Sequence, residues 1–297
     1  MDGLIDLHIH TNKSDGEFSP IEILNFAKEN NVKYLSLTDH DSLDAYTEDV
    51  FKKAKELEIN LITGVEISTK IDKCGIHVLG YNVDINNVAL NEMLYKIRNA
   101  RHIYLHDVGK RLIEIGYKID IDELDKIDVV TKAHISSQIV SNKENEEKLL
   151  EYFGYIPNRG EFIEAIMNEG CIAYVSKYVP TLTEIYEVVK NAGGKVYLAH
   201  PVAYIHIDNL AKEDIQNIVN ELKPDGIETN YILVNKENEK IDEIDRWNEF
   251  ANKNNLFVSI GSDFHRFGNN HPVVGLVGEN IKISNEEKEM IIRNILS

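Results

Sequence analysis

Short apolar runs alternate along this chain with amphipathic segments, and this alternation constrains the fold more than any other feature. Strand-like runs occur at residues 4–10, 34–41, 59–68, 75–83, 195–201, 225–229 and 256–265. Helical patterns occur at 20–30, 42–58, 181–192, 211–222 and 236–254, and a capped amphipathic helix ends the chain. Strands that alternate with helices favour parallel pairing, because a parallel connection needs a long crossover. The sequence therefore predicts an α/β fold with parallel strands and helical crossovers.

The stretch between residues 86 and 174 departs from this rhythm. Apolar residues keep helical spacing there, as at Leu90, Leu94 and Ile97, and strand-like runs are missing. We therefore expect a helical insertion at 86–174 within an α/β domain formed by 1–85 and 175–297.

Composition narrows the class of protein. With 43% hydrophobic residues, the 297-residue chain has enough apolar side chains for a substantial core. It has no apolar run as long as a membrane span and no basic start typical of a signal peptide, so no membrane partner is expected. Cys74 and Cys171 lack disulfide or metal spacing, which is typical of a reduced cytoplasmic protein. A net charge of −18 argues against binding long nucleic acid but permits a small phosphorylated substrate.

The first apolar run, at residues 4–10, carries a polar side chain at every second position. Successive side chains of a strand point to opposite faces, so Asp6, His8 and His10 share one face. Burying two imidazoles there is costly unless a partner holds them. A metal ion would be such a partner.

Polar side chains recur where the other strand-like runs end or begin. They are His40, Glu66, His77, His200, Asp263 and His265, with Asp15 in the loop after the first run. Each has an ordinary explanation by itself, as a helix cap, a turn residue or a solvated side chain. Their coincidence favours a metal centre, because the carboxyl ends of barrel strands meet at one edge. Imidazole and carboxylate donors without thiolate suit Mn²⁺, Fe²⁺ or Zn²⁺.

The order of these motifs resembles the PHP superfamily of phosphoesterases, named for polymerase and histidinol phosphatase. The motifs are His-Ile-His-Thr, Thr-Asp-His-Asp, Gly-Val-Glu followed by His-Val-Leu-Gly-Tyr, Ala-His-Pro and Gly-Ser-Asp-Phe-His. The resemblance covers nearly the whole chain. It looks closest to the branch that hydrolyses nucleoside 3′,5′-bisphosphates and trims short RNA from its 5′ end. It implies a distorted (β/α)7 TIM-like barrel with three divalent ions, Mn²⁺ first, with Fe²⁺ or Zn²⁺ as alternatives.

The resemblance also implies how the ligands divide. The first ion takes His8, His10, Glu66 and Asp263, the second takes Glu66, His77 and His200, and the third takes Asp15, His40 and His265. A bridging Glu66 would hold two ions roughly 3.5–4 Å apart and lower the pKa of the water between them. The expected mechanism is in-line attack of that bridging hydroxide on phosphorus, without a covalent intermediate and with Glu66 and Asp263 as catalytic ligands.

Substrate contacts are expected in the insertion and after the last motif. Where relatives carry Arg-x-His, with the histidine facing the substrate phosphate, this chain has Lys132 and His134. Lys132 keeps the charge but lacks the bidentate fork of arginine. We expect His134 to bind substrate and act in catalysis, Lys132 and Arg266 to bind phosphate, and the insertion to form part of the cleft. Val202-Ala203 departs from the Gly-Arg of relatives after His-Pro.

Other interpretations remain open. A histidinol-phosphate-type monoesterase of the same superfamily is the main alternative. A scaffold without activity is disfavoured because all nine expected ligands are present. Amidohydrolases also begin with His-x-His, but they usually have a bridging lysine and a later His, His, Asp order that this chain does not show. The oligomeric state, the base preference, the choice between mononucleotide and oligonucleotide, and the roles of His102, His106, His206 and His271 stay undetermined. A solvated face is expected for His102 and His106.

Overall fold

The computed structural model describes residues 3–72, 74–127, 129–176, 178–235, 239–268, 272–275 and 283–297. The chain divides into two compact units. Unit 1 comprises Met1–Leu94 and Pro180–Ser297, and unit 2 comprises Tyr95–Val179. Among the described helices, none combines the length and the apolar character needed to cross a membrane.

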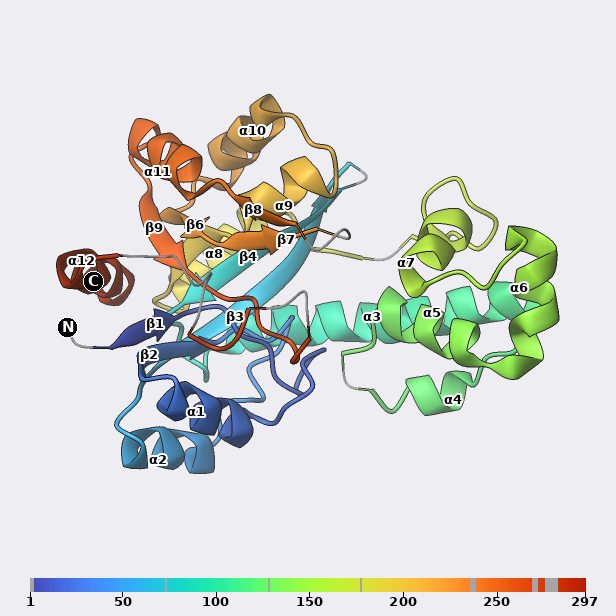
Figure 1. Ribbon diagram of the computed structural model, residues 1–297, viewed down its shortest axis with the longest axis horizontal. Coiled ribbons are helices and arrows are strands. Elements are labelled where there is room, and N and C mark those ends of the chain that lie inside the picture. The colour runs from blue at the N-terminus through green and yellow to red at the C-terminus, as the bar shows by residue number, and fades with distance from the viewer. Residues whose placement is uncertain are drawn as a thin grey trace. The chain divides into compact units, whose positions relative to one another are not determined.

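Unit 1 is built around a seven-stranded sheet with the order β1-β2-β3-β4-β5-β6-β9. Its strands are β1 (Leu4–Asp6), β2 (Val32–Leu37), β3 (Asn60–Ile71), β4 (Cys74–Tyr81), β5 (Lys195–Leu198), β6 (Gly226–Asn230) and β9 (Phe257–Ile260). Hydrogen bonds from Leu7 N to Ile260 O (3.0 Å) and from His10 N to Phe264 O (2.9 Å) join the first and last strand segments. Because its two edges meet, the sheet closes into the distorted TIM-like barrel expected from the sequence (Figure 1).

One strand runs against the expected direction. β4 pairs antiparallel with both β3 and β5, whereas the other neighbouring pairs of the sheet are parallel. Only residues 72–73 connect β3 to β4. A connection of that length allows a hairpin but not a helical crossover, so the prediction of parallel pairing was wrong at this strand.

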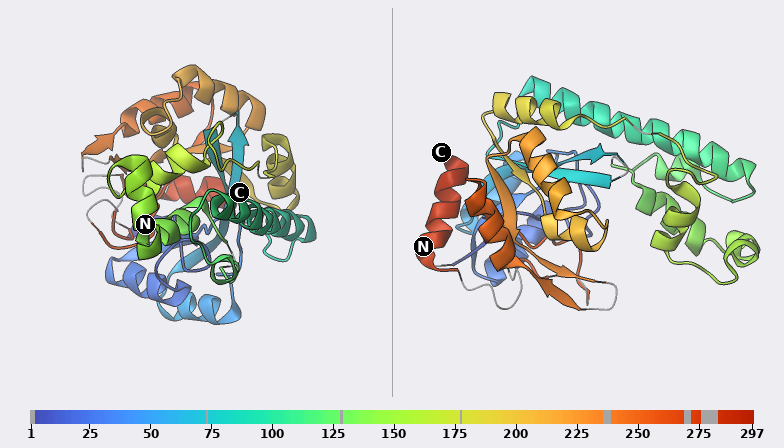
Figure 2. Two further views of the ribbon diagram at one scale, coloured as in Figure 1. Left: turned by 90° about the vertical axis from the view of Figure 1, so that its right-hand side faces the viewer. Right: turned by 90° about the horizontal axis from the view of Figure 1, so that it is seen from above.

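The helices of unit 1 lie outside the sheet (Figures 1 and 2). They are α1 (Pro20–Glu29), α2 (Glu48–Glu56), α8 (Leu182–Asn191), α9 (Pro201–His206), α10 (Lys212–Leu222), α11 (Ile244–Lys253) and α12 (Asn285–Leu296). The predicted start of α1 is confirmed, because Ser19 and Glu22 form a reciprocal capping box before Pro20.

The C-terminal helix α12 takes part in the barrel core. Its Ile291, Ile292 and Ile295 pack in one cluster with Ile5 and Leu7 of the first strand segment. Lys288 Nζ also donates a hydrogen bond to Gly3 O at 2.9 Å. Figure 2 shows α12 beside the N-terminal end of the chain, so this helix covers the end of the barrel where the strands begin.

Two expected helices of unit 1 begin later than their patterns suggest. Helix α2 begins at Glu48, although the helical pattern starts at residue 42. Tyr46 points toward the sheet instead, because its hydroxyl donates to Leu37 O (2.6 Å) and Ile62 O (3.0 Å). The pattern at 236–254 starts with residues 236–238, which lie outside the described residues. It continues with β8 (Lys240–Asp242), which pairs antiparallel with β7 (Ile232–Val234), and α11 follows.

The described part of unit 2 is helical, without strands. Its elements are α3 (Val88–Glu114, which begins in unit 1), α4 (Ile121–Leu124), α5 (Lys132–Ser141), η1 (Lys143–Asn145), α6 (Glu146–Phe153), α7 (Arg159–Phe162) and η2 (Ile163–Met167). Leu105, Val108, Ile135, Phe162 and Ile166 form the centre of its core. The helical spacing noted in the sequence between residues 86 and 174 corresponds to these helices.

Candidate metal centre

The expected ligands converge at one end of the barrel in unit 1. His8 and His10 follow β1, His40 follows β2, His200 follows β5, and Asp263 and His265 follow β9. Glu66 lies within β3 and forms an isolated bridge with His40. His77 lies near the start of β4, and the reversed direction of β4 brings that start to the end where the parallel strands finish.

Glu66 lies at the centre of the cluster and is 1% exposed. Its Oε2 lies 3.1 Å from His10 Nε2, 3.2 Å from His40 Nδ1 and 3.3 Å from His8 Nε2. Its Oε1 lies 3.0 Å from His77 Nδ1 and 3.1 Å from His200 Nε2. One carboxylate therefore contacts five imidazoles, an arrangement that would suit a ligand shared between cations.

The ligand atoms fall into three overlapping groups. His8, His10, Glu66 and Asp263 form one, and their ligand atoms lie within 4.8 Å of one another. Another joins Glu66 with His77 and His40. His200 belongs beside it, because its Nε2 is 3.4 Å from His77 Nδ1.

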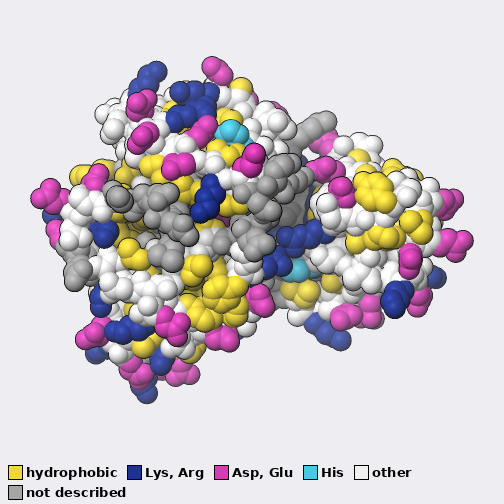
Figure 3. Space-filling model, in the orientation of Figure 1, with side chains coloured by type: hydrophobic (Ala, Val, Ile, Leu, Met, Phe, Trp, Pro, Cys, Tyr) yellow, Lys and Arg dark blue, Asp and Glu magenta, His cyan; other side chains and the backbone are white. Residues whose placement is uncertain are grey.

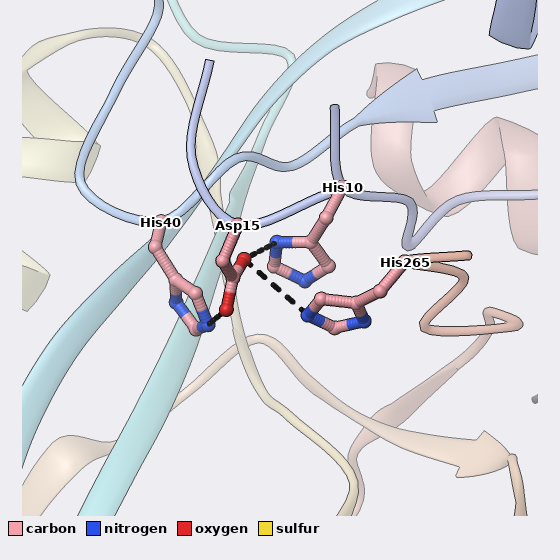
Figure 4. Close-up of side chains that lie close together, drawn as sticks. All are labelled: His10, Asp15, His40 and His265. Carbon is pink, nitrogen blue, oxygen red and sulfur yellow. Dashed lines mark ion pairs between the residues drawn. The ribbon is translucent and has the colours of Figure 1, made fainter. Parts of the chain in front are cut away.

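The third group surrounds Asp15 (Figure 4). Asp15 Oδ1 lies 3.5 Å from His10 Nδ1 and 3.4 Å from His265 Nε2, and Oδ2 lies 3.9 Å from His40 Nε2. The His10 and His265 rings are stacked, with centroids 4.1 Å apart. His10 thus faces the first group with Nε2 and this group with Nδ1, a sharing that the sequence did not predict.

The cluster is poorly satisfied by its own hydrogen bonds. Within the described residues, Asp15 Oδ1, Glu66 Oε2, His40 Nδ1 and His200 Nδ1 are buried without a hydrogen bond of acceptable geometry. The Nε2 atoms of His8 and His10 also lie only 3.2 Å apart. Buried polar atoms rarely stay unpaired. Divalent cations would satisfy converging lone pairs of this kind, and the imidazole and carboxylate donors fit such ions.

The charges of the cluster favour bound cations. Burial alone would raise the pKa of Glu66, but the rings of His40, His77 and His8 lower it well below its ordinary value. Burial opposes protonation of His10, yet Asp263 and Glu66 raise its pKa to about 10. For His40 burial prevails and lowers the pKa to about 3. The carboxylates thus attract positive charge, for which protons and metal ions compete.

Four fully buried carboxylates outside the groups hold the ligands in place. Glu228 accepts from His8 Nδ1 (3.1 Å to Oε1) and from the backbone N–H of His200 (2.9 Å to Oε2). Asp39 accepts from Thr11 N (2.7 Å) and Ser14 Oγ (2.6 Å), which fixes the loop that carries Asp15. Such partners orient metal-bound imidazoles and the segments that carry them.

Asp6 and Asp41 serve the backbone in the same way. Asp6 accepts from Ser262 N (2.9 Å) and Gly275 N (2.7 Å), and burial raises its pKa to about 6. Asp41 accepts from Ser68 N at 2.8 Å, two residues beyond Glu66.

Tyr231 is a site residue that the sequence analysis missed. Its hydroxyl donates to Asp263 Oδ2 at 3.3 Å, and its ring lies 5.6 Å from the ring of His200. Tyr231 comes directly after β6, another strand of the parallel set, and this position is the sequence signal that could have identified it.

The expected substrate residues have local contacts of their own. His134 Nδ1 accepts from Thr131 N at 3.1 Å, which makes His134 part of the capping box of α5. Lys132 Nζ donates to Asn168 Oδ1 at 2.9 Å within unit 2. Arg266 is exposed in unit 1. His206 contacts Glu243 Oε1 at 3.1 Å, and His271 lies outside the described residues.

Several known proteins resemble this chain in sequence. A family model described as PHP domain matches residues 6–262. A 5′-3′ exoribonuclease of Haemophilus influenzae is 30% identical over 88% of this chain and 89% of its own. A 3′,5′-nucleoside bisphosphate phosphatase of Chromobacterium violaceum is 25% identical over 91% of this chain and 90% of its own.

A solved structure has the same fold. It is a candidate metal-dependent phosphoesterase from Bifidobacterium adolescentis, with a TM-score of 0.74 and 21% identity, covering 100% of this chain and 98% of that one. The fold, the ligand cluster and the relatives together define a hydrolase that acts on phosphate ester bonds. The chain belongs to the PHP domain family.

Proposed function

We propose that this protein is a metal-dependent phosphoesterase that hydrolyses nucleoside 3′,5′-bisphosphates, 5′-phosphorylated short RNA, or both. The observation that carries the proposal is the contact of one buried carboxylate, Glu66, with five imidazoles. The two relatives named for these activities support the substrate class. Figure 3 shows Asp and Glu side chains interspersed with Lys and Arg over the visible face, and the net charge of −18 suits a small substrate better than long nucleic acid.

The proposed centre holds three divalent ions, with Mn²⁺ expected first and Fe²⁺ or Zn²⁺ as alternatives. Glu66 would be shared between two of these sites, and the carboxylate of Asp263 would contribute to the first. When bound, such ions activate water for attack on phosphorus and neutralise the phosphate oxygens.

The protein's own residues would then orient the reaction. Hydrogen bonding to Glu228 keeps a proton on His8 Nδ1, so that the lone pair of Nε2 faces Glu66 and Asp263. Tyr231 holds Oδ2 of Asp263 and thereby leaves Oδ1 for the cluster. Neither step needs a nucleophilic side chain.

Substrate binding is assigned to cationic groups. We propose that Arg266 contacts a phosphate from unit 1, and that Lys132 and His134 do so from the insertion at 86–174, which forms part of the substrate cleft. His134 is proposed to take part in catalysis as well. A cytoplasmic location, where nucleotides and RNA ends are available, completes the proposal.

The experiment is phosphate release with added Mn²⁺ from a panel of substrates. The panel holds nucleoside 3′,5′-bisphosphates, 5′-phosphorylated short RNA and histidinol phosphate. We expect turnover of the first two. Turnover of histidinol phosphate alone would overturn the proposal in favour of the monoesterase alternative.

Variants test the bridging role of Glu66. Glu66→Gln keeps the shape but removes the charge, so activity and two of the three bound ions should be lost. The exposed control Glu147→Gln should retain activity and all three ions. Full turnover by Glu66→Gln would contradict the assignment.

A further inference from the structure

A second group of metal-type donors lies within unit 2. His102 and His106 are one turn apart on α3, and Asp125 follows the last residue of α4. Asp125 Oδ1 lies 2.7 Å from His102 Nδ1, and Oδ2 lies 3.3 Å from His106 Nε2. The sequence showed only the histidine pair, and the fold brings a carboxylate from another segment to both rings.

The donor types suit a transition ion. Histidines at positions i and i+4 of a helix share one face and are a recurrent zinc-binding pair. Two imidazoles with one carboxylate favour Zn²⁺ and its neighbours over Mg²⁺ or Ca²⁺, which prefer oxygen ligands. The side chains are 26%, 53% and 38% exposed for His102, His106 and Asp125, so an ion can enter and keep water as a further ligand.

The local charge also favours a cation. In the segment 120–126, Asp120, Asp122 and Glu123 accompany Asp125, against the single basic residue Lys126.

We propose that His102, His106 and Asp125 bind a divalent transition ion of the Zn²⁺ type, which ties α3 to the end of α4. On binding, the exposed side chains rotate until both ring nitrogens reach the ion. The proton that each ring shares with the carboxylate passes to the other ring nitrogen or to water. The site braces unit 2 and takes no part in hydrolysis.

The test uses the full chain reconstituted with Mn²⁺, so that exchange at the main centre is counted separately. Zn²⁺ is added against a chromophoric chelator, and the manganese released is measured in the same sample. The quantity of interest is the zinc bound in excess of the manganese released. We expect about one equivalent per chain for the unaltered protein.

Variants locate that equivalent. The double variant His102→Ala/His106→Ala should lose it, and Asp125→Asn should weaken it, with phosphate release unchanged in both. His206→Ala is the matched control, because His206 is also a partly exposed histidine paired with a carboxylate, and it should keep the equivalent. No excess zinc in the unaltered protein, or equal excess in the double variant, would show a hydrogen-bonded pair only and overturn the proposal.

Discussion

Glu228→Gln is the sharpest test of how the proposed centre is held. Glu228 is fully buried, and its two oxygens accept hydrogen bonds from His8 Nδ1 and from the backbone N–H of His200. Glutamine has the same shape but only one accepting oxygen. Whichever way the amide turns, its NH₂ group faces one of these two donors.

The expected magnitude follows from that mismatch. A lost hydrogen bond that leaves a buried donor unpaired costs about 1–3 kcal/mol of folding free energy. Hydrogen-bond partners of metal-bound histidines change metal affinity by about 10–100-fold. That range corresponds to about 1.4–2.7 kcal/mol, the same size as the hydrogen-bond cost. We therefore expect both the free energy of unfolding and the metal affinity to fall.

The assays are urea unfolding of the metal-free protein and a Mn²⁺ titration against a competing chelator. Glu221→Gln on α10 is the matched control, because that glutamate is exposed and should change neither quantity. If Glu228→Gln loses stability but binds Mn²⁺ as tightly as before, Glu228 supports the fold alone. The orientation argument for His8 would then be refuted.

Three further predictions concern pH and packing. The pKa of His10 is raised to about 10 in the metal-free cluster, so protons compete with metal ions below that pH. The Mn²⁺ affinity measured by chelator competition should therefore rise steadily from pH 6 to pH 9. Burial raises the pKa of Asp6 from 3.8 to about 6, so the native state holds this proton more tightly than the unfolded chain and stability attributable to Asp6 falls as pH rises from 4 to 6. That contribution is about 3 kcal/mol, and urea unfolding of metal-free Asp6→Asn should lack it; an unchanged pH slope would contradict it. Ile295 of α12 is fully buried in the barrel core, so Ile295→Ala should cost about 2–5 kcal/mol in urea unfolding, and a loss below 1 kcal/mol would show that α12 is not part of that core.

The sequence predicted correctly those features that depend on interactions between residues close together in the chain. The capping pairs Ser19 with Glu22 and Ser284 with Glu287 are formed in the structure, because a cap depends on residues within one helical turn. The polar residues at strand ends do converge, because parallel strands of one sheet end at a common edge. The predicted start of α2 was wrong, because the Tyr46 hydroxyl donates hydrogen bonds to two neighbouring strands. No pattern within 42–58 reveals that contact.

The sequence could not predict that His10 is shared between two of the ligand groups, and the reason is different. Whether His10 faces one group or two depends on side-chain reach across the barrel, and both of its ring nitrogens lie within 3.5 Å of carboxylate oxygens. The third donor beside His102 and His106 was hidden in the same way, because nothing local relates Asp125 to α3.

The β3–β4 hairpin explains how the antiparallel direction of β4 contributes to the candidate metal centre. Ser68 lies opposite His77 and Glu66 lies opposite Leu79, so all four side chains share one face of the pair. Glu66 and His77 are therefore diagonal neighbours, within reach of each other's long side chains, and Glu66 Oε1 meets His77 Nδ1 at 3.0 Å. A slip of one residue would turn His77 to the opposite face and remove it from the cluster. The short connection at residues 72–73 thus fixes the direction of β4 and, through the register, the place of a proposed metal ligand.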